Sequence, residues 1–214
     1  MFELLFPFFL LVLFLLVSTI IWRINARKYI SSGTVASAYD AWTQDKLLER
    51  LWGEHIHLGF YTLGGRNIDF RKAKVQFVHE LVKWSGLDKL PKGSRILDVG
   101  CGIGGSSRIL AKYYGFNVTG ITISSAQVKR ARELTPFGLS CNFQVMDAMD
   151  LKFEDGAFDG VWSVEAGAHM NDKAKFADEI LRTLRPGGYM ALADWNSRDL
   201  RANPPSFFEK LVLK

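Results

Sequence analysis

The sequence has only two cysteines, Cys101 and Cys141, among its 214 residues. Two thiols so placed indicate no disulfide framework and fit a reducing compartment. The chain also lacks internal repeats, and it has no low-complexity segment beyond its first residues. Its net charge is +5, but no basic stripe recurs after the N-terminal region. We therefore expect no nucleic-acid partner.

Charge is absent from residues 4–22, the one long apolar run of the sequence. As a helix this run would span about 28 Å, close to the hydrocarbon thickness of a bilayer. A cleaved signal peptide is the alternative, but it needs basic residues before the run, where the only charge is Glu3. Arg23, Arg27 and Lys28 follow the run directly. The sequence therefore predicts a single-pass membrane anchor, with the rest of the chain on the cytoplasmic or equivalent side.

The remaining composition, 48% hydrophobic and 23% charged, is that of a globular protein. Its length leaves room for one ordinary domain and an appendage. We divide the chain into three regions. Residues 1–29 form the anchor and its basic flank, residues 30–91 a helical extension that acts as an active-site lid, and residues 92–214 the core.

Short apolar runs alternate with helix-length segments from residue 94 onward. The predicted strands are residues 95–99, 117–122, 142–146, 158–163 and 189–194, and the predicted helices are residues 106–114, 125–134 and 173–184. Strands separated by helices require crossover connections and a parallel sheet. The expected fold class is thus α/β with a Rossmann-like core. Before it, helical periodicity marks residues 35–52 and 71–84.

A glycine-rich loop follows the first predicted strand, where residues 96–105 read ILDVGCGIGG. Gly100, Gly102 and Gly104 would let the backbone turn tightly and approach a ligand. The spacing differs from the G-x-G-x-x-G pattern of hydride-transfer enzymes, because Gly105 stands where a variable residue would be. Asp98 suits a cationic amino group better than a pyrophosphate. The alternative is a tight turn that binds no nucleotide.

A carboxylate is missing at the end of the second strand, where an acid would normally grip a ribose diol. Thr122 could bond a hydroxyl there more weakly, or could simply satisfy backbone groups at the strand end. After the third strand, Asp147 precedes Ala148. Asp147 can accept from an exocyclic amine such as that of adenine, and a solvated turn acid is the alternative.

Glu165 and His169 lie four residues apart after the fourth strand, at the edge where open sheets bind ligands. If that segment is helical, both side chains face the same side. They are our candidates for acid–base chemistry, and the alternative for His169 is a structural hydrogen bond.

Two further histidines, His55 and His57, stand beside Glu54 in a predicted loop. No third and fourth ligand recur at metal-binding spacing, so we predict no metal. We expect this loop to cover the active site, lined by Tyr39, Trp52 and Tyr61.

Several segments together resemble a known family. ILDVGCGIGG, GITIS, DGAFDGVWS and TLRPGGYMAL resemble the class I S-adenosylmethionine (SAM)-dependent methyltransferases. VASAYDAWTQD, WGEHIHLGFY, WSVEAGAHMNDK and ADWNSRD are similar to the tocopherol-pathway group within them. In the wider group, which includes sterol and cyclopropane-forming enzymes, a Thr-aliphatic pair and a Gln contact the cofactor. The resemblance carries these roles to Thr122, Ile123 and Gln127.

The resemblance implies methyl transfer from SAM to a ring carbon of a lipid-soluble prenylated hydroquinone, as in tocopherol and plastoquinone biosynthesis. For this chemistry we expect His169 to contact the phenolic oxygen, while Glu165 orients His169 or binds the cofactor's amino group. The expected cofactor-binding residues are Tyr39, Asp98, Gly100, Cys101, Gly102, Gly104, Thr122, Ile123, Gln127, Asp147, Ala148 and Glu165.

Other functions stay open. A gamma-tocopherol, sterol or cyclopropane-type methyltransferase would differ in its acceptor. A membrane-tethered protein that binds SAM without catalysis belongs to another class.

Cores of the resembled family ordinarily continue through two further strands, so we expect this chain to be a fragment without its C-terminal strands.

Overall fold

The computed structural model describes residues 12–18, 32–62 and 68–196, together with residues 202, 204 and 206. The chain divides into two compact units, Met1–Thr34 and Val35–Lys214. In the first unit, residues 12–18 are helical and mostly exposed. Within the described ranges, no helix is both long and apolar enough to cross a membrane. Most of the predicted anchor, residues 4–22, lies outside these ranges.

A five-stranded parallel sheet with the order β3-β2-β1-β4-β5 forms the centre of the second unit. The strands are β1 (Arg95–Val99), β2 (Asn117–Thr122), β3 (Cys141–Val145), β4 (Phe158–Val164) and β5 (Leu184–Ala193). This confirms the predicted Rossmann-like parallel sheet. The strand order reverses between β1 and β4, and such a switch point opens a crevice at the carboxyl ends of the strands.

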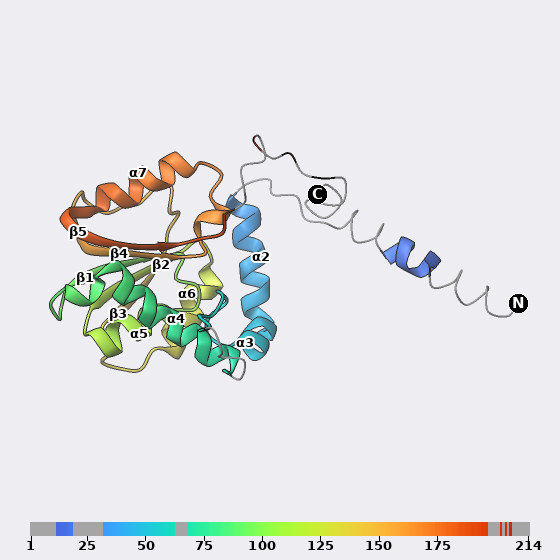
Figure 1. Cartoon of the computed structure of the whole chain (residues 1–214), viewed down its shortest axis with the longest axis horizontal. Coiled ribbons are helices and arrows are strands. Elements are labelled where there is room, and N and C mark those ends of the chain that lie inside the picture. Colours follow the sequence, from blue (N-terminus) through green and yellow to red (C-terminus); the bar gives the residue numbers. More distant parts are fainter. Residues whose placement is uncertain are drawn as a thin grey trace, which may run out of the picture. The chain divides into compact units, whose positions relative to one another are not determined.

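Helices cover both faces of the sheet (Figure 1). One face carries α4 (Phe70–Ser85), α5 (Gly105–Tyr114) and α6 (Ser125–Leu134), and the other carries α7 (Lys173–Thr183). On the first face Val82 and Leu110 pack with Trp162. On the second, Val161 packs with Ile180. Most residues of β1 and β4 are therefore buried, as is typical of central strands in a parallel sheet that is covered on both faces.

The helices before the core are α2 (Ser32–Gln44) and α3 (Leu47–Trp52). The prediction of one continuous helical stretch over residues 35–52 is wrong, because Lys46 between them has φ 53°. A residue other than glycine in this conformation ends a right-handed helix. Residues 53–62 then form a loop without helix or strand, as predicted.

Two short 3₁₀ turns complete the described elements, η1 (Leu87–Lys89) and η2 (Gly167–His169). At the far edge, β5 begins five residues before its predicted start, with an irregular register opposite Phe158 and Gly160. Gly187 adopts φ 72° in this stretch. Residues 186–188, Pro-Gly-Gly, therefore lie within the irregular first part of β5, and α7 has already ended at Thr183.

Candidate active site

The glycine loop crosses the carboxyl end of β1 and leads into α5. A side chain at Gly100 would place its Cβ 2.4 Å from the Cβ of Ala166, so the loop is tightly packed toward β4. A Cβ at Gly102 would meet nothing within 4 Å. Gly102 also has φ 55°, a conformation that glycine adopts without strain. The glycine loop is thus closely packed at Gly100, while space for a ligand is open beside Gly102.

Asp98 lies beneath this loop and is 2% exposed. Its Oδ2 accepts a hydrogen bond of 2.5 Å from the Ser107 hydroxyl on α5. Burial raises the pKa of this carboxyl to about 7, although the Ser107 bond opposes the rise. A nearby cation would favour the charged form. The neighbouring Cys101 thiol is buried, and burial raises its pKa well above the usual value, so it remains an unreactive thiol.

Thr122 and Gln127 bond each other at the end of β2. The Thr122 hydroxyl donates to Oε1 of Gln127 over 2.7 Å and accepts from the backbone N–H of Ser124. Both side chains are buried. The sequence left open whether Thr122 binds a ligand or satisfies local groups, and in this structure its hydroxyl serves the local groups. Ile123, between them, is half-buried.

A carboxylate that the sequence did not single out joins the start of α6 to α2. Asp40 accepts from the Ser124 hydroxyl over 2.5 Å and from the backbone N–H of Ala126 over 3.1 Å. Ser124 itself caps the helix by accepting from the N–H of Gln127. A carboxylate at a helix N-terminus is favoured by the free N–H groups and the helix dipole. Asp40 thereby places its neighbour Tyr39 beside the site.

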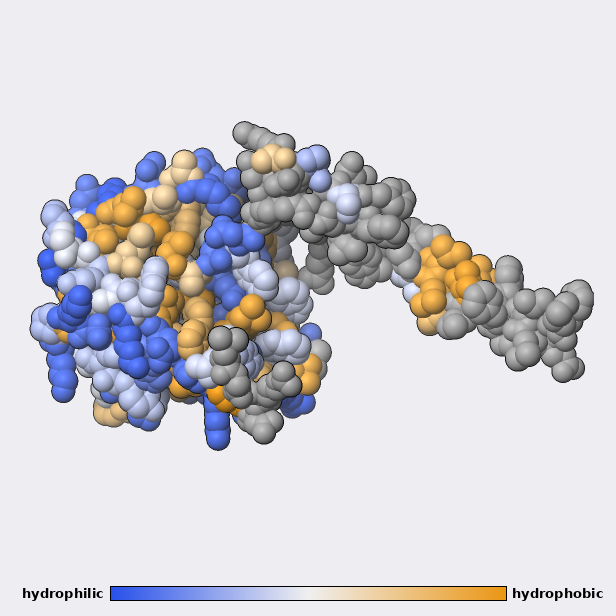
Figure 2. Space-filling view, viewed as in Figure 1, coloured by the Kyte–Doolittle hydropathy of each residue, from blue (hydrophilic) through white to orange (hydrophobic). Residues whose placement is uncertain are grey.

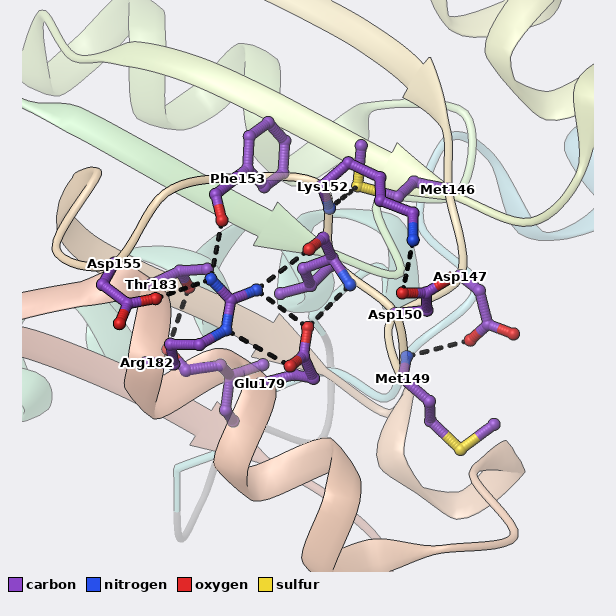
Figure 3. A network of polar contacts seen from close by, with 12 residues as sticks. Met146, Asp147, Met149, Asp150, Lys152, Phe153, Asp155, Glu179, Arg182 and Thr183 are labelled. Carbon is purple, nitrogen blue, oxygen red and sulfur yellow. Dashed lines mark hydrogen bonds and ion pairs between the residues drawn. The ribbon is translucent and has the colours of Figure 1, made fainter.

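Asp147 and Ala148 occupy an irregular loop between β3 and β4. Asp147 Oδ1 accepts from the N–H of Met149 over 2.9 Å, while Ala148 is 3% exposed. Figure 3 shows how Arg182 and Glu179 of α7 reach this loop. Arg182 donates to the carbonyls of Leu151 and Phe153, and Glu179 accepts from the N–H of Leu151. The loop is thus held by side chains from α7.

Tyr39 and His169 come together from positions far apart in the sequence. The Tyr39 hydroxyl lies 2.9 Å from Nε2 of His169, and the rings meet edge to face. Burial, and then the nearby Glu165 charge, raise the pKa of Tyr39. The condition that one helix carries both candidate acid–base residues is not met, because Glu165 has φ 52° and lies before η2. Tyr39 thus contacts His169 and lies within reach of the Glu165 charge, while no hydrogen bond joins Glu165 and His169 directly.

The loop of residues 53–62 reaches the site through its backbone. The N–H of Leu58 donates to Oε1 of Glu165 over 3.0 Å. A small pocket opens between α2, α3, the glycine loop and α6. It is lined by Tyr39, Trp42, Thr43, Leu48, Glu49, Gly53, Ile56, Ile103 and Gln127. Of the three residues predicted to line the lid, Tyr39 lines this pocket. The side chains of Trp52 and Tyr61 are exposed and are not part of the lining.

His55 and His57 are buried and bond each other, with 3.1 Å between Nδ1 of His55 and Nε2 of His57. Across the described ranges, no group of three or more potential metal ligands comes together.

Sequence reasoning missed Asp40, Ser107 and Lys74. Ser124 as a helix cap indicated where a partner such as Asp40 could bind, but no local pattern pointed to Lys74.

Comparison with known proteins relates this chain to methyltransferases. Residues 97–192 match a family model described as a methyltransferase domain. The chain belongs to this family. Over 211 residues, or 99% of its length, it is 57% identical to the 2-methyl-6-phytyl-1,4-hydroquinone methyltransferase of Synechocystis sp., covering 66% of that protein. It is 42% identical over 73% of its length to the chloroplastic tocopherol O-methyltransferase of Arabidopsis thaliana, covering 48% of that protein.

The chain therefore spans just under two thirds of the first relative and about half of the second. Among solved structures, it is similar to phosphoethanolamine N-methyltransferase 2 of Haemonchus contortus, which is in complex with S-adenosyl-L-methionine. That similarity has a TM-score of 0.54 and 28% identity, and it covers 71% of this chain and 32% of the other. The family's methyltransferase core is present here from β1 to β5.

Proposed function

We propose that this protein is a SAM-dependent C-methyltransferase that acts on a prenylated hydroquinone. The observation that carries the proposal is the 57% identity to the hydroquinone methyltransferase along nearly the whole chain. The site residues fit SAM. Gly102 leaves the loop open, and Asp98 offers a buried carboxyl to a cationic amino group. Asp147, just after β3, offers an acceptor for the adenine amine in this proposal.

SAM supplies an electrophilic methyl group on a sulfonium. The protein has to hold the electron-rich ring carbon in line with that methyl and to exclude water, which lowers the barrier by orientation. The ring carbon forms the new C–C bond while the C–S bond breaks, and the ring then loses a proton. His169 is suited to hold the phenolic oxygen or to take up a proton. Its 2.9 Å contact with Tyr39 orients the imidazole.

Glu165 has the complementary role in this proposal. Its carboxylate accepts from the N–H of Leu58, and its charge reaches Tyr39. It can therefore bind a cationic amino group or stabilise positive charge on His169.

Residues 1–29 complete the proposal as a membrane anchor. The uncharged run and the basic residues after it support this assignment. A prenyl chain partitions into lipid, so a tethered enzyme would meet its acceptor at the bilayer surface, with the core on the cytoplasmic or equivalent side.

A second acceptor is favoured by the 42% identity to tocopherol O-methyltransferase. Methyl transfer from labelled SAM to 2-methyl-6-phytyl-1,4-hydroquinone, compared with gamma-tocopherol, separates the two candidates. We expect the first acceptor to be methylated faster. Tight SAM binding without transfer to any quinol would instead favour the non-catalytic alternative.

The cofactor site is tested by calorimetric titration of SAM into the full chain and into Gly102→Ala. A Cβ there would occupy the space open to the ligand, so we expect binding to weaken by at least about tenfold, the equivalent of 1.4 kcal/mol. Gly138→Ala is the matched control, since Gly138 also has positive φ and no atom within 4 Å of its Cβ position. Equal affinity in both variants would contradict the proposed cofactor site.

A further inference from the structure

Lys74 on α4 is a buried cation that forms no ion pair within the described part of the chain. It is 4% exposed. Its Nζ donates to the carbonyls of Trp52, over 3.1 Å, and His55, over 2.7 Å. The ammonium lies 5.8 Å and 5.1 Å from the ring centres of Trp52 and Phe70. A buried charge is costly unless it is satisfied, and here backbone carbonyls and aromatic faces take the place of water. Lys74 thus holds the start of the loop of residues 53–62.

The His55–His57 pair continues from this clamp, and its protonation pattern follows from its partners. The carbonyl of Leu58 only accepts, so Nδ1 of His57, at 2.7 Å, carries a proton. In a neutral ring Nε2 of His57 is then bare, and it accepts from Nδ1 of His55 over 3.1 Å. Burial lowers the pKa of both rings, that of His55 to about 3. Both rings therefore stay neutral at physiological pH, each protonated on Nδ1.

The end of this chain of contacts is the Glu165 carboxylate. The Leu58 carbonyl is held by His57, and the N–H of the same residue donates to Oε1 of Glu165 over 3.0 Å. Glu165 has φ 52°, a left-handed conformation that is unfavourable for a residue other than glycine and that surrounding contacts must maintain. Gly105 leaves room for the His55 ring, because a Cβ at this position would lie 2.9 Å from that ring.

We propose that Lys74, His55 and His57 are positioning residues that hold the N–H of Leu58 against Glu165 and so fix the orientation of its carboxylate in the active site. The proposal rests on the proposed function, because it gives Glu165 a role there. It also assigns a role to His55 and His57. Nδ1 of His55 bonds Nε2 of His57, and Nδ1 of His57 bonds the backbone carbonyl of Leu58.

The protonation pattern is tested directly by nitrogen-15 NMR of the imidazoles in the full chain in detergent micelles. The chain has four histidines, so single substitutions assign each signal. We expect His55 and His57 both to carry the proton on Nδ1 between pH 7 and pH 8. A proton on Nε2 of His57, or a charged ring in this range, would overturn the proposal. This measurement requires neither SAM nor turnover, so its failure is distinct from failure of the proposed function.

The positioning role is tested with Lys74→Met, which keeps the aliphatic stem and removes the donors. We expect the Leu58 amide proton to move upfield as its bond to Glu165 lengthens. We expect kcat for quinol methylation to fall at least about tenfold, while the Kd for SAM changes by less than about threefold. Lys74→Arg should restore part of both signals, because it can donate to the same carbonyls.

Lys72→Met is the matched control, since Lys72 is an exposed cation on the same helix and should leave both readouts unchanged. An unshifted Leu58 amide in Lys74→Met would overturn the positioning role. The same holds if kcat falls only in proportion to SAM affinity and thermal stability, since that is the result for a merely structural residue.

Discussion

The glycine loop and the lid formed by α2, α3 and residues 53–62 border the same site but are held in different ways. Backbone bonds hold the glycine loop, where the N–H groups of Gly100 and Cys101 both donate to the carbonyl of Ile121 over 2.9 Å. Side chains hold the lid, through Lys74 and through the Glu49–Arg130 and Glu54–Arg108 ion pairs.

The two regions also differ in what they expose. The strands that carry the glycine loop are buried on both faces, whereas Leu51, Trp52 and Leu58 of the lid are 51%, 45% and 56% exposed. Figure 2 shows hydrophobic side chains at the surface near the lower end of α2, where α3 lies. Elements with few buried contacts open at low free-energy cost. We expect an atom added at Gly100, where the glycine loop is closely packed, to destabilise the fold, and loss of a side-chain contact of the lid to loosen the lid alone.

The largest effect is expected for Gly100→Ala, which tests the backbone-held region. The added Cβ would lie 2.4 Å from that of Ala166, at φ 76°. Overpacking and the backbone conformation together should lower the free energy of unfolding by about 2–4 kcal/mol, measured with urea. Adding Ala166→Gly should restore the part due to the clash. No recovery in the double variant would show that the clash is not the cause.

Arg182→Met is expected to come next, because it removes donors to two loop carbonyls. The variant leaves the part-buried carbonyls of Leu151 and Phe153 without these donors, which should cost about 1–2 kcal/mol of unfolding free energy. SAM binding should weaken in parallel, since the same loop carries Asp147. The control Lys152→Met removes an exposed pair with Asp150 and should change neither property. Unaltered SAM affinity in Arg182→Met would show that this loop does not contribute to SAM binding.

Asp98 should make SAM binding depend on pH. Its folded pKa of about 7 lies above the usual 3.8, so the unliganded carboxyl is protonated below pH 7 and must ionise to bind a cation. Affinity should therefore rise about tenfold per unit from pH 5 to pH 7 and then level off. By the same linkage, the free protein loses stability as pH rises from 3.8 to 7. Calorimetry on Asp98→Asn should show no such rise in affinity, and an identical profile would rule out Asp98 as the titrating group.

The smallest effect is expected for Glu49→Gln, which weakens the lid alone. Arg130 donates to both carboxylate oxygens over 2.6 and 2.8 Å and thereby lowers the pKa of Glu49. Such partly exposed pairs contribute about 1 kcal/mol or less, and this contribution is lost in the wild type as pH falls through the lowered pKa. Faster amide exchange in α3 with unchanged exchange in β1 would show that this ion pair holds the lid and not the glycine loop. Equal acceleration in both elements would contradict that difference.

The fold followed closely from local sequence signals. The strands at residues 95–99 and 117–122 match β1 and β2, because buried apolar runs end there at turn residues. The boundary at Lys46 was missed, since its positive φ has no sequence signature. Asp147 and Glu165 could be placed at the ends of strands, but their partners could not. The Leu58 N–H is separated by 107 residues from the carboxylate that it bonds.

The sequence alone determined the glycine loop, the parallel order of elements and the family, because backbone conformation and hydrophobic periodicity are local properties. Only the tertiary structure decided how the histidines are used. The Tyr39–His169 contact joins two distant segments at an exposed position. The His55–His57 pair and the buried Lys74 depend on side chains that meet after packing has excluded water. Burial then makes each bond necessary, because an unpaired polar group in the interior has no solvent to replace its partner.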